Sequence, residues 1–387
     1  MNILFLMKYY QVGGQETVTN VLAHKFIEEG HNVSVVCFTE LSPIMLERAD
    51  KQIHFYGLGD FKASKKNITS LREILINEKI NIIINQWGLP YIPTKVASEA
   101  SRSLNIKYIS VYHNDPGTNG RLKVIEQQLH KEQSAIKRGV LKVKWQIVRI
   151  MTGISMNYVY RHSDFYALLS KSFIESFRKF AFLKNVSKVK VIANPLTIDF
   201  SDTDDLKQRE ILFVGRLENN QKRVDRILDI WALLYRKYPN WKLTIVGDGE
   251  DRDMLEEKSR KLQLKNIEFA GYHNPVEYFK RASILLLTSD YEGFGLVIIE
   301  GMIYGVVPVV YGSYSAVYDI IDDTVDGLII SKDTESVIPV KMAEKIEMLI
   351  DSPVLLNQMS IRAIEKSKNY SLDKIYLAWM SMLFNRH

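Results

Sequence analysis

The run from Glu292 to Glu300 places two carboxylates around two glycines, a combination suited to binding a ligand at the start of a helix. The apolar stretch Ile284–Leu287 precedes the run and predicts a buried strand, so the glycines fall in a strand-to-helix turn. Glycine lets a ligand approach the backbone, and the free N–H groups of a helix start attract anions. We predict that Glu292 and Glu300, about two helical turns apart, share one helix face and hold hydroxyls of a single ligand. A nucleotide sugar, which is both phosphorylated and polyhydroxylated, fits this pattern.

Two cations follow another predicted strand and could neutralise the phosphates of such a ligand. Arg216 comes directly after Gly215, at the end of the strand predicted over 210–214, and Lys222 follows in the same loop. Arginine offers a planar fork of donors to phosphate, whereas lysine acts as a point charge. Arg223 comes next, and we expect it to be tolerated there if its side chain points outward.

The first half of the chain carries a second glycine loop. Gly13 and Gly14 follow the strand predicted over 3–7 and precede a helix predicted over 16–29, so the loop can approach a diphosphate closely. His113 ends another predicted strand, at 108–112. Ligands of open α/β sheets bind beyond the carboxyl ends of the strands, which makes both the loop and the histidine candidate site residues.

Together these motifs resemble those of retaining glycosyltransferase family 4, where E-x7-E accompanies a G-G-x-E loop and a G-R-L segment followed by K-G. The carboxylate pair, the glycine pair and the two cations match these patterns, and Arg223 departs from them by replacing the glycine. The resemblance implies an α/β GT-B fold, with two facing Rossmann-like domains, a deep interdomain cleft and a C-terminal helix that crosses back to the N-terminal domain. It also implies that the anomeric configuration of the transferred sugar is retained.

The same resemblance implies roles for individual residues. Glu300 would bind the ribose hydroxyls, Glu292 would face the transferred sugar, and backbone groups near Tyr272 would pair with the base. The donor-binding set is Gly14, Arg216, Lys222, Gly247, Tyr272, Glu292, Phe294, Gly295, Leu296 and Glu300. The catalytic set is His113, Glu292, Arg216 and Lys222, and the acceptor-side candidates are His113 and Asn194. No metal or other cofactor is expected, because in this family the cations and helix N-termini stabilise the leaving diphosphate.

A chain of 387 residues is long enough for two domains, and predicted strands alternate with helices in both halves. Strands are predicted at 3–7, 33–38, 53–56, 80–85, 108–112, 165–168, 189–192, 210–214, 242–246, 267–269, 284–287, 306–310 and 327–330. We place an N-terminal acceptor-binding domain at 1–198 and a nucleotide-sugar-binding domain at 199–370, with a polar linker over 199–209. A C-terminal helix at 371–387 is expected to pack on the N-terminal domain.

A basic helical insertion at about 121–160 interrupts the first alternation. Residues 121–150 hold eight cations against two carboxylates, an excess that equals the formal charge of +6 of the whole chain. Cations beside apolar residues suit an anionic membrane surface, although a hairpin that merely covers the sheet has the same pattern. No nucleic-acid-binding module is visible, so nucleic acid is not an expected partner.

Cysteine content and hydropathy limit the cellular compartments in which we expect the protein. The single cysteine, Cys37, excludes an intramolecular disulfide, and no apolar stretch approaches the ~18–20 residues of a membrane span. The segment 1–7 lacks a basic leader and a cleavage site and is predicted to be a strand. We therefore expect a cytoplasmic protein that attaches peripherally to the inner face of the plasma membrane.

The implied reaction is transfer of a hexose or N-acetylhexosamine from a nucleoside-diphosphate sugar, expected to be a UDP-sugar, to a hydroxyl of a saccharide acceptor. A lipid-linked acceptor, such as a polyprenyl diphosphate, would place this hexosyltransferase in the synthesis of bacterial surface polysaccharide or glycan. Two alternatives stay open. A nucleotide-sugar 2-epimerase of GT-B architecture would release an isomer without using an acceptor, and an inactive nucleotide-sugar-binding subunit would release no product.

Overall fold

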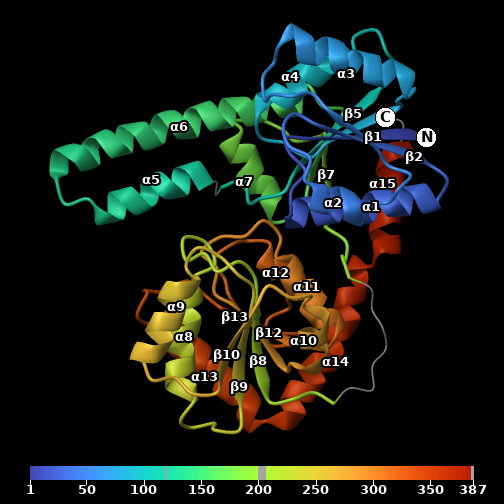
Figure 1. Ribbon diagram of the computed structural model, residues 1–387. Coiled ribbons are helices and arrows are strands. Elements are labelled where there is room, and N and C mark those ends of the chain that lie inside the picture. The colour runs from blue at the N-terminus through green and yellow to red at the C-terminus, as the bar shows by residue number, and fades with distance from the viewer. Residues whose placement is uncertain (118–119, 199–205, 385–387) are drawn as a thin grey trace. The chain divides into compact units, whose positions relative to one another are not determined.

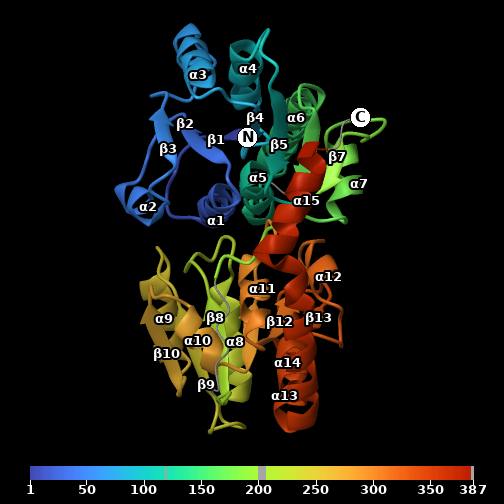
Figure 2. The same cartoon turned by 90° about the vertical axis from the view of Figure 1, so that its right-hand side faces the viewer.

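The computed structural model describes residues 1–117, 120–198 and 206–384. Most of the predicted linker, and the last residues of the predicted C-terminal segment, lie outside these ranges. The chain divides into two compact units: unit 1 comprises Met1–Pro195 with Leu372–His387, and unit 2 comprises Leu196–Ser371. Each unit is built on one parallel β-sheet with helices on both faces (Figures 1 and 2).

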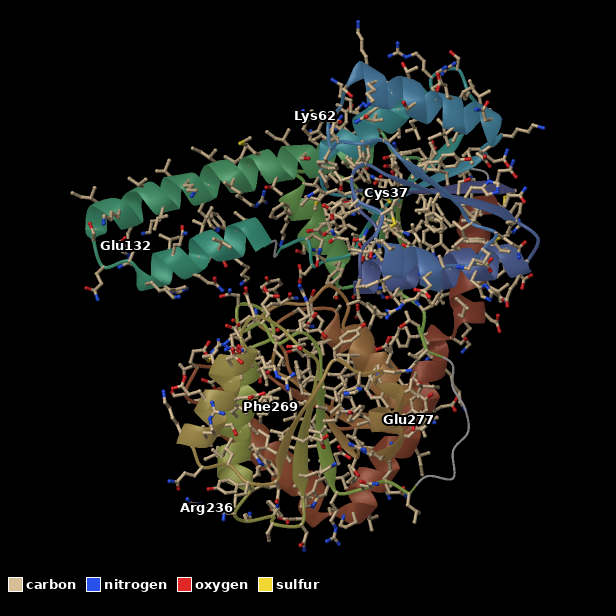
Figure 3. All side chains as sticks on the ribbon, viewed as in Figure 1. Cys37, Lys62, Glu132, Arg236, Phe269 and Glu277 are labelled. Atoms are coloured by element: carbon tan, nitrogen blue, oxygen red, sulfur yellow. The ribbon has the colours of Figure 1, made fainter. Side chains whose placement is uncertain are left out.

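The sheet of unit 1 has seven parallel strands in the order β3-β2-β1-β4-β5-β6-β7. The third strand in this order, β1, is continuously buried from Ile3 to Met7, as expected for a parallel strand covered on both faces. Cys37 is buried in the neighbouring strand β2 (Figure 3). The strands are β1 (Asn2–Met7), β2 (Asn32–Cys37), β3 (His54–Gly57), β4 (Ile82–Asn85), β5 (Lys107–Tyr112), β6 (Phe165–Leu168) and β7 (Val189–Val191).

Helices cover both faces of this sheet. One face packs α3 and α4, and the other packs α1 and the C-terminal helix α15. Phe26 of α1 meets Tyr376 of α15 with ring centroids 5.5 Å apart, and Lys25 Nζ lies 2.8 Å from an Asp373 carboxylate oxygen, so α15 belongs to unit 1. The helices are α1 (Gly14–Glu28), α2 (Pro43–Arg48), α3 (Lys65–Asn77), α4 (Tyr91–Ala100), α5 (Gly120–Lys131), α6 (Ala135–Arg161), α7 (Phe173–Phe180) and α15 (Leu372–Phe384).

The basic insertion forms a helical hairpin of α5 and α6, with Glu132 at its turn (Figures 1 and 3). Trp145 of α6 faces α5, because its indole nitrogen donates to Glu126 Oε1 at 3.2 Å. Among the helices that the structure describes, none is long and apolar enough to cross a membrane.

Unit 2 repeats the same strand order with six parallel strands, β10-β9-β8-β11-β12-β13. The strands are β8 (Glu210–Val214), β9 (Lys242–Val246), β10 (Ile267–Gly271), β11 (Ile284–Leu287), β12 (Val307–Tyr311) and β13 (Leu328–Ile330). The helices are α8 (Val224–Leu234), α9 (Arg252–Lys261), α10 (Val276–Arg281), α11 (Leu296–Ile303), α12 (Val317–Ile320), α13 (Ile338–Asp351) and α14 (Pro353–Ser367), followed by a 3-10 turn (Lys368–Tyr370). Trp231 of α8, which is 1% exposed, lies in the larger of the cores that flank this sheet.

In both sheets, the direction in which the chain adds new strands reverses at the first strand, β1 or β8. The chain moves outward from β1 through β2 to β3 and then returns to β4 on the other side of β1, and β8 and β11 repeat this arrangement. Connections on the two sides of such a switch point leave opposite faces of the sheet, which opens a crevice at the carboxyl ends of the strands. The loops after β1 and β4 in unit 1, and after β8 and β11 in unit 2, are therefore the places where each sheet can bind a ligand.

Candidate active site

The two glutamates of the E-x7-E run lie on different structural elements. Helix α11 begins at Leu296, and Gly295 caps it with a φ of +87°, so Glu292 lies in the preceding loop and Glu300 lies inside the helix. The prediction that both carboxylates share one helix face is therefore wrong, because the left-handed turn at Gly295 interrupts the helical path. Glycine is needed at this position for two reasons. The positive φ strains any residue that has a Cβ, and a Cβ would lie 2.5 Å from Tyr314 Oη.

Glu292 and Lys222 meet at the switch point of unit 2. Lys222 Nζ donates to Glu292 Oε1 at 2.6 Å, and the Ser289 hydroxyl donates to the same oxygen at 2.6 Å. Both partners are largely buried, with side chains 14% and 10% exposed. The loop after β8 and the loop after β11 thus bring a cation, a carboxylate and a helix N-terminus together.

Glu300 forms a second, partly buried carboxylate on the first turns of α11. It accepts a hydrogen bond from the Thr197 hydroxyl. Burial raises the pKa of Glu300, and the Thr197 hydroxyl offsets part of that rise. A carboxylate with one hydroxyl already bound has acceptor capacity left for hydroxyls of a ligand.

Arg216 is the exposed cation of this loop. Its side chain is 70% exposed and reaches Glu218 Oε2 at 3.4 Å and Gln221 Oε1 at 3.3 Å. Gly247 packs against the backbone of Gly215, the residue before Arg216, because a Cβ on Gly247 would lie 1.9 Å from the Gly215 carbonyl oxygen. The next helix, α9, begins only at Arg252, so Gly247 is not at a helix N-terminus and serves the packing of two strand-end loops.

The remaining predicted donor residues surround the carboxyl edge of the sheet in unit 2. Tyr272 directly follows β10 and is 64% exposed. Phe294 is 4% exposed, and its ring lies 5.7 Å from that of Tyr370, so only its backbone is suited to ligand contact. Leu296 starts α11, where the first N–H groups of a helix have no partner within the helix.

In unit 1, a buried glutamine links the loops at the switch point. Gly14 is the first residue of α1, and Gln15 in the same turn donates to the Gln86 carbonyl at 2.9 Å. His113, directly after β5, bonds through Nε2 to Gln86 Oε1 at 2.6 Å. Gln86 thus links the turn of Gly14 with His113, whereas Asn194, which is buried, follows the edge strand β7 and is not part of this group.

Burial lowers the pKa of His113 to about 4, so its imidazole is neutral near pH 7. A neutral imidazole carries one N–H. The side-chain oxygen of Gln86, Oε1, accepts a hydrogen bond from this N–H on Nε2, which leaves Nδ1 as an acceptor.

The depressed pKa of His113 predicts a pH-dependent loss of stability. The pKa of His113 in the unfolded chain is near 6.5. The stability that the buried, neutral imidazole contributes to the folded protein is therefore present above pH 6.5 and is lost as the pH falls towards 4. We expect the melting temperature of His113→Gln to fall less than that of the unmodified protein between pH 6.5 and 4. Thermal melts across this range test the difference, and parallel curves would show that His113 is not a buried neutral imidazole.

Several residues that support this site were not predicted from the sequence. Gln86 and Trp87 follow β4, and Lys8 lies 5.4 Å from the centre of the Trp87 ring and at similar distances from those of Tyr9 and Phe61. The strand predicted over 80–85 ended directly before Gln86, so the rule that ligands bind beyond strand ends could have found it. Ser289 and Thr197 carry no such signal, because single hydroxyl residues are common in loops.

The sequence is similar to glycosyltransferase families and to individual glycosyltransferases. A family model described as Glycosyltransferase Family 4 matches residues 12–200, and one described as Glycosyl transferases group 1 matches residues 197–366. The sequence is 25% identical to an uncharacterized glycosyltransferase of Haemophilus influenzae over 98% of both chains. It is also 25% identical to the Campylobacter jejuni enzyme named GalNAc-alpha-(1->4)-GalNAc-alpha-(1->3)-diNAcBac-PP-undecaprenol alpha-1,4-N-acetyl-D-galactosaminyltransferase, over 99% of this chain and 98% of the relative.

The solved structure of Anabaena HepE in complex with UDP superposes with a TM-score of 0.76 at 16% identity and 99% coverage of both chains, a likeness that concerns the fold. The two parallel-sheet α/β units, in Rossmann strand order, define a GT-B fold. The family models and the named relatives add the activity, and the chain is a glycosyltransferase. These matches favour sugar transfer over the 2-epimerase and over an inactive subunit.

Proposed function

We propose that this glycosyltransferase retains the anomeric configuration and moves a hexose or N-acetylhexosamine from a UDP-sugar to a hydroxyl of a lipid-linked saccharide. The observation that carries the proposal is the Lys222–Glu292 pair at 2.6 Å beside the N-terminus of α11. UDP-bound structures of the same fold support the nucleotide. The undecaprenol-linked substrate in the name of the Campylobacter jejuni relative supports the lipid-linked acceptor.

Departure of the nucleoside diphosphate is the demanding step of this reaction. Negative charge develops on the leaving oxygen while positive charge builds at the anomeric carbon. Lys222, Arg216 and the N-terminus of α11 supply positive potential to the leaving phosphates, so we propose that no metal ion is needed. Glu292, which Lys222 and Ser289 hold in place, recognises a hydroxyl of the transferred sugar, and Glu300 recognises the ribose.

The acceptor side is proposed in unit 1. The neutral His113 offers Nδ1 to a hydroxyl, and the rings of Tyr9 and Trp87 offer apolar faces to a sugar ring. These residues follow β5, β1 and β4, adjacent strands of one sheet, so a saccharide at the switch point could meet them together.

The outer face of α6 supports peripheral binding to a membrane. An apolar stripe, defined as Ile136, Val140, Val143, Ile147, Ile150, Met151 and Ile154, is between 47% and 82% exposed. Helical periodicity places these residues on one side of α6, away from Trp145 and α5, with Lys137 and Lys144 along one edge. An apolar stripe with cations at its margin suits the interface of an anionic bilayer. We propose that α6 lies in such a surface, from which the acceptor would be drawn.

A thermal-shift screen followed by product analysis tests the reaction. UDP-sugars are expected to raise the melting temperature by mass action, whereas GDP-sugars are expected to shift it less. Nuclear magnetic resonance of the product should show an α-linkage from an α-configured donor. A β-linked product would disprove retention, and a free sugar-nucleotide isomer formed without acceptor would establish the epimerase instead.

Substitution of Glu300 tests the proposed ribose contact. Glu300→Ala is expected to raise the dissociation constant of UDP about 10- to 150-fold, because a hydrogen bond to a charged acceptor contributes ~1.5–3 kcal/mol. Glu300→Gln is the matched control, since it keeps the side-chain shape and an oxygen for the Thr197 hydroxyl but removes the charge. Titration calorimetry measures both variants, and unchanged UDP affinity in Glu300→Ala would remove this residue from the site.

A further inference from the structure

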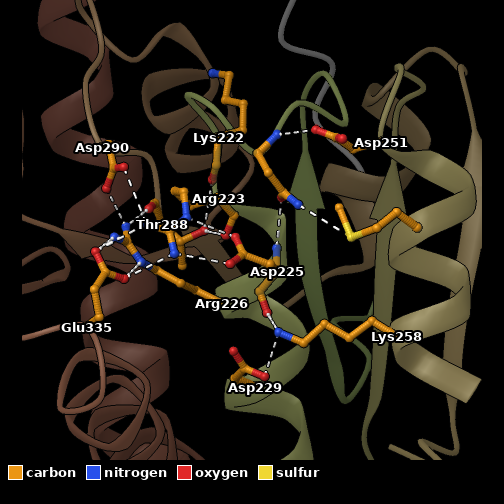
Figure 4. A network of polar contacts seen from close by, with 12 residues as sticks. Lys222, Arg223, Asp225, Arg226, Asp229, Asp251, Lys258, Thr288, Asp290 and Glu335 are labelled. Atoms are coloured by element: carbon orange, nitrogen blue, oxygen red, sulfur yellow. Dashed lines mark hydrogen bonds and ion pairs between the residues drawn. The ribbon is translucent and has the colours of Figure 1, made fainter. Parts of the chain in front are cut away.

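Arg223, the residue that replaces the glycine of the family pattern, adopts the backbone conformation of a glycine. Its φ of +50° and ψ of +48° lie in the left-handed region, which strains any residue with a Cβ. The side chain does not point outward, so the condition under which we expected it to be tolerated is not met. The guanidinium donates to both carboxylate oxygens of Asp225, at 3.0 and 3.1 Å, and to both of Glu335, at 3.2 and 3.0 Å (Figure 4).

Glu335 binds a second arginine at the same time. Arg226 is 2% exposed, and it donates to the two oxygens of Glu335 at 3.1 and 2.5 Å. Its other contacts are Asp290 Oδ1 at 2.7 Å and the Thr288 carbonyl at 2.9 Å. A buried guanidinium is tolerated only when carboxylates and carbonyls surround it in this way, so the arrangement is expected to be rigid.

The network joins the segments that follow three strands, at the carboxyl edge of the unit 2 sheet; Arg223 caps helix α8, and Asp225 and Arg226 lie in its first turn. Asp225 and the two arginines follow β8, Asp290 follows β11, and Glu335 follows β13. Two hydrogen bonds to backbone carbonyls also link the segment after β11 to the loop after β8. The Thr288 hydroxyl donates to the carbonyl of Lys222 at 3.1 Å, and the Asp290 N–H donates to the carbonyl of Gln221 at 2.8 Å. The loops that carry Lys222 and Glu292 are thus connected through this network.

We propose that Glu335 is a positioning residue of the donor site: by bridging Arg223 and Arg226, it stabilises the left-handed turn that holds Lys222 against Glu292. A glycine would adopt this turn without a side-chain partner, whereas the arginine needs its guanidinium held. The inference rests on the proposed role of Lys222 and Glu292 in donor binding. Glu335 acts through the arginines, and its own side chain is 65% exposed.

A double-mutant cycle tests the inference. Glu335→Ala is expected to lower kcat/KM for a UDP-sugar about 10- to 100-fold, because displacement of a positioned group by about 1 Å costs up to that much. In an Arg223→Gly background the same substitution should cost less than about threefold, since glycine holds the turn by itself. Glu257→Ala is the matched control, because Glu257 pairs with Lys261 at 2.6 Å on the exposed face of α9 and should leave kcat/KM unchanged.

Hydrogen exchange of the segment 217–223 provides a readout that needs no substrate. Faster exchange is expected in Glu335→Ala than in the unmodified protein, and the difference should disappear in the double variant Arg223→Gly with Glu335→Ala. If no UDP-sugar is turned over, the proposed function fails while this measurement still decides the positioning role. Normal kinetics and exchange in Glu335→Ala, or an equal loss in both backgrounds, would overturn the inference.

Discussion

Replacement of Lys222 by alanine is expected to lower kcat/KM for sugar transfer by about 10²–10³-fold. Lys222, in the loop after β8, is largely buried, and its Nζ lies 2.6 Å from Glu292 Oε1 in the loop before α11. Its charge would meet the leaving diphosphate as the glycosidic bond lengthens, in surroundings where burial strengthens an electrostatic contact. The effect should therefore appear in kcat as well as in KM, and neither Mg²⁺ nor Mn²⁺ should restore activity.

Steady-state kinetics with a UDP-sugar measure this change. Lys366→Ala is a suitable control, because Lys366 is also a partly buried lysine in an ion pair, with Asp322 at 2.6 Å, but lies on α14. Melting temperatures separate lost catalysis from lost stability, since Glu292 keeps the Ser289 hydroxyl when Lys222 is removed. Near-normal turnover in Lys222→Ala, or an absolute need for a divalent ion in the unmodified enzyme, would refute the proposed role.

The fold could be predicted from the pattern of apolar residues in the sequence, because both sheets are parallel and buried. Runs such as Ile284–Leu287 are apolar throughout, and each predicted strand overlaps an observed one with ends differing by at most two residues. The terminal helix, predicted within 371–387, is observed as α15 (Leu372–Phe384), and residues 385–387 lie outside the described residues. Such strands can be read from local sequence, since both faces of the sheet demand apolar side chains.

The candidate site was predicted less completely because its geometry depends on contacts distant in sequence. The glycines and cations lie directly after strands, so their positions were visible, and Gly295 does form the left-handed turn at a helix start. The placement of Glu292 before the helix could not be read from spacing alone. Glu335 meets Arg223 and Arg226 only through the fold, and no local pattern indicates that an exposed acid in a loop will bind two arginines.

Charge reversal on the helical hairpin is expected to abolish binding to anionic vesicles. The variant changes Lys137, Arg138, Lys142 and Lys144 to glutamate. Each cation near an anionic surface contributes about 1 kcal/mol, so reversing four of them outweighs the marginal insertion of one exposed apolar stripe. Sedimentation with vesicles that contain an anionic lipid measures the binding, which should also weaken as salt rises, because the attraction is screened. Transfer to a short soluble acceptor should survive, since the proposed donor residues lie in unit 2.

The apolar stripe provides an independent test of the same surface. Ile147→Asp with Met151→Asp should reduce vesicle binding although the charge cluster is intact, because these side chains are 53% and 65% exposed and have no core to leave. Val354→Asp with Ile361→Asp is the matched control, since these residues are 69% and 60% exposed and lie on α14, in unit 2. Equal loss in both pairs would point to a general charge effect. Unchanged binding in the α6 pair and in the charge-reversed variant would leave α5 and α6 as a structural cover, and the proposal of a lipid-linked acceptor would lose its main physical support.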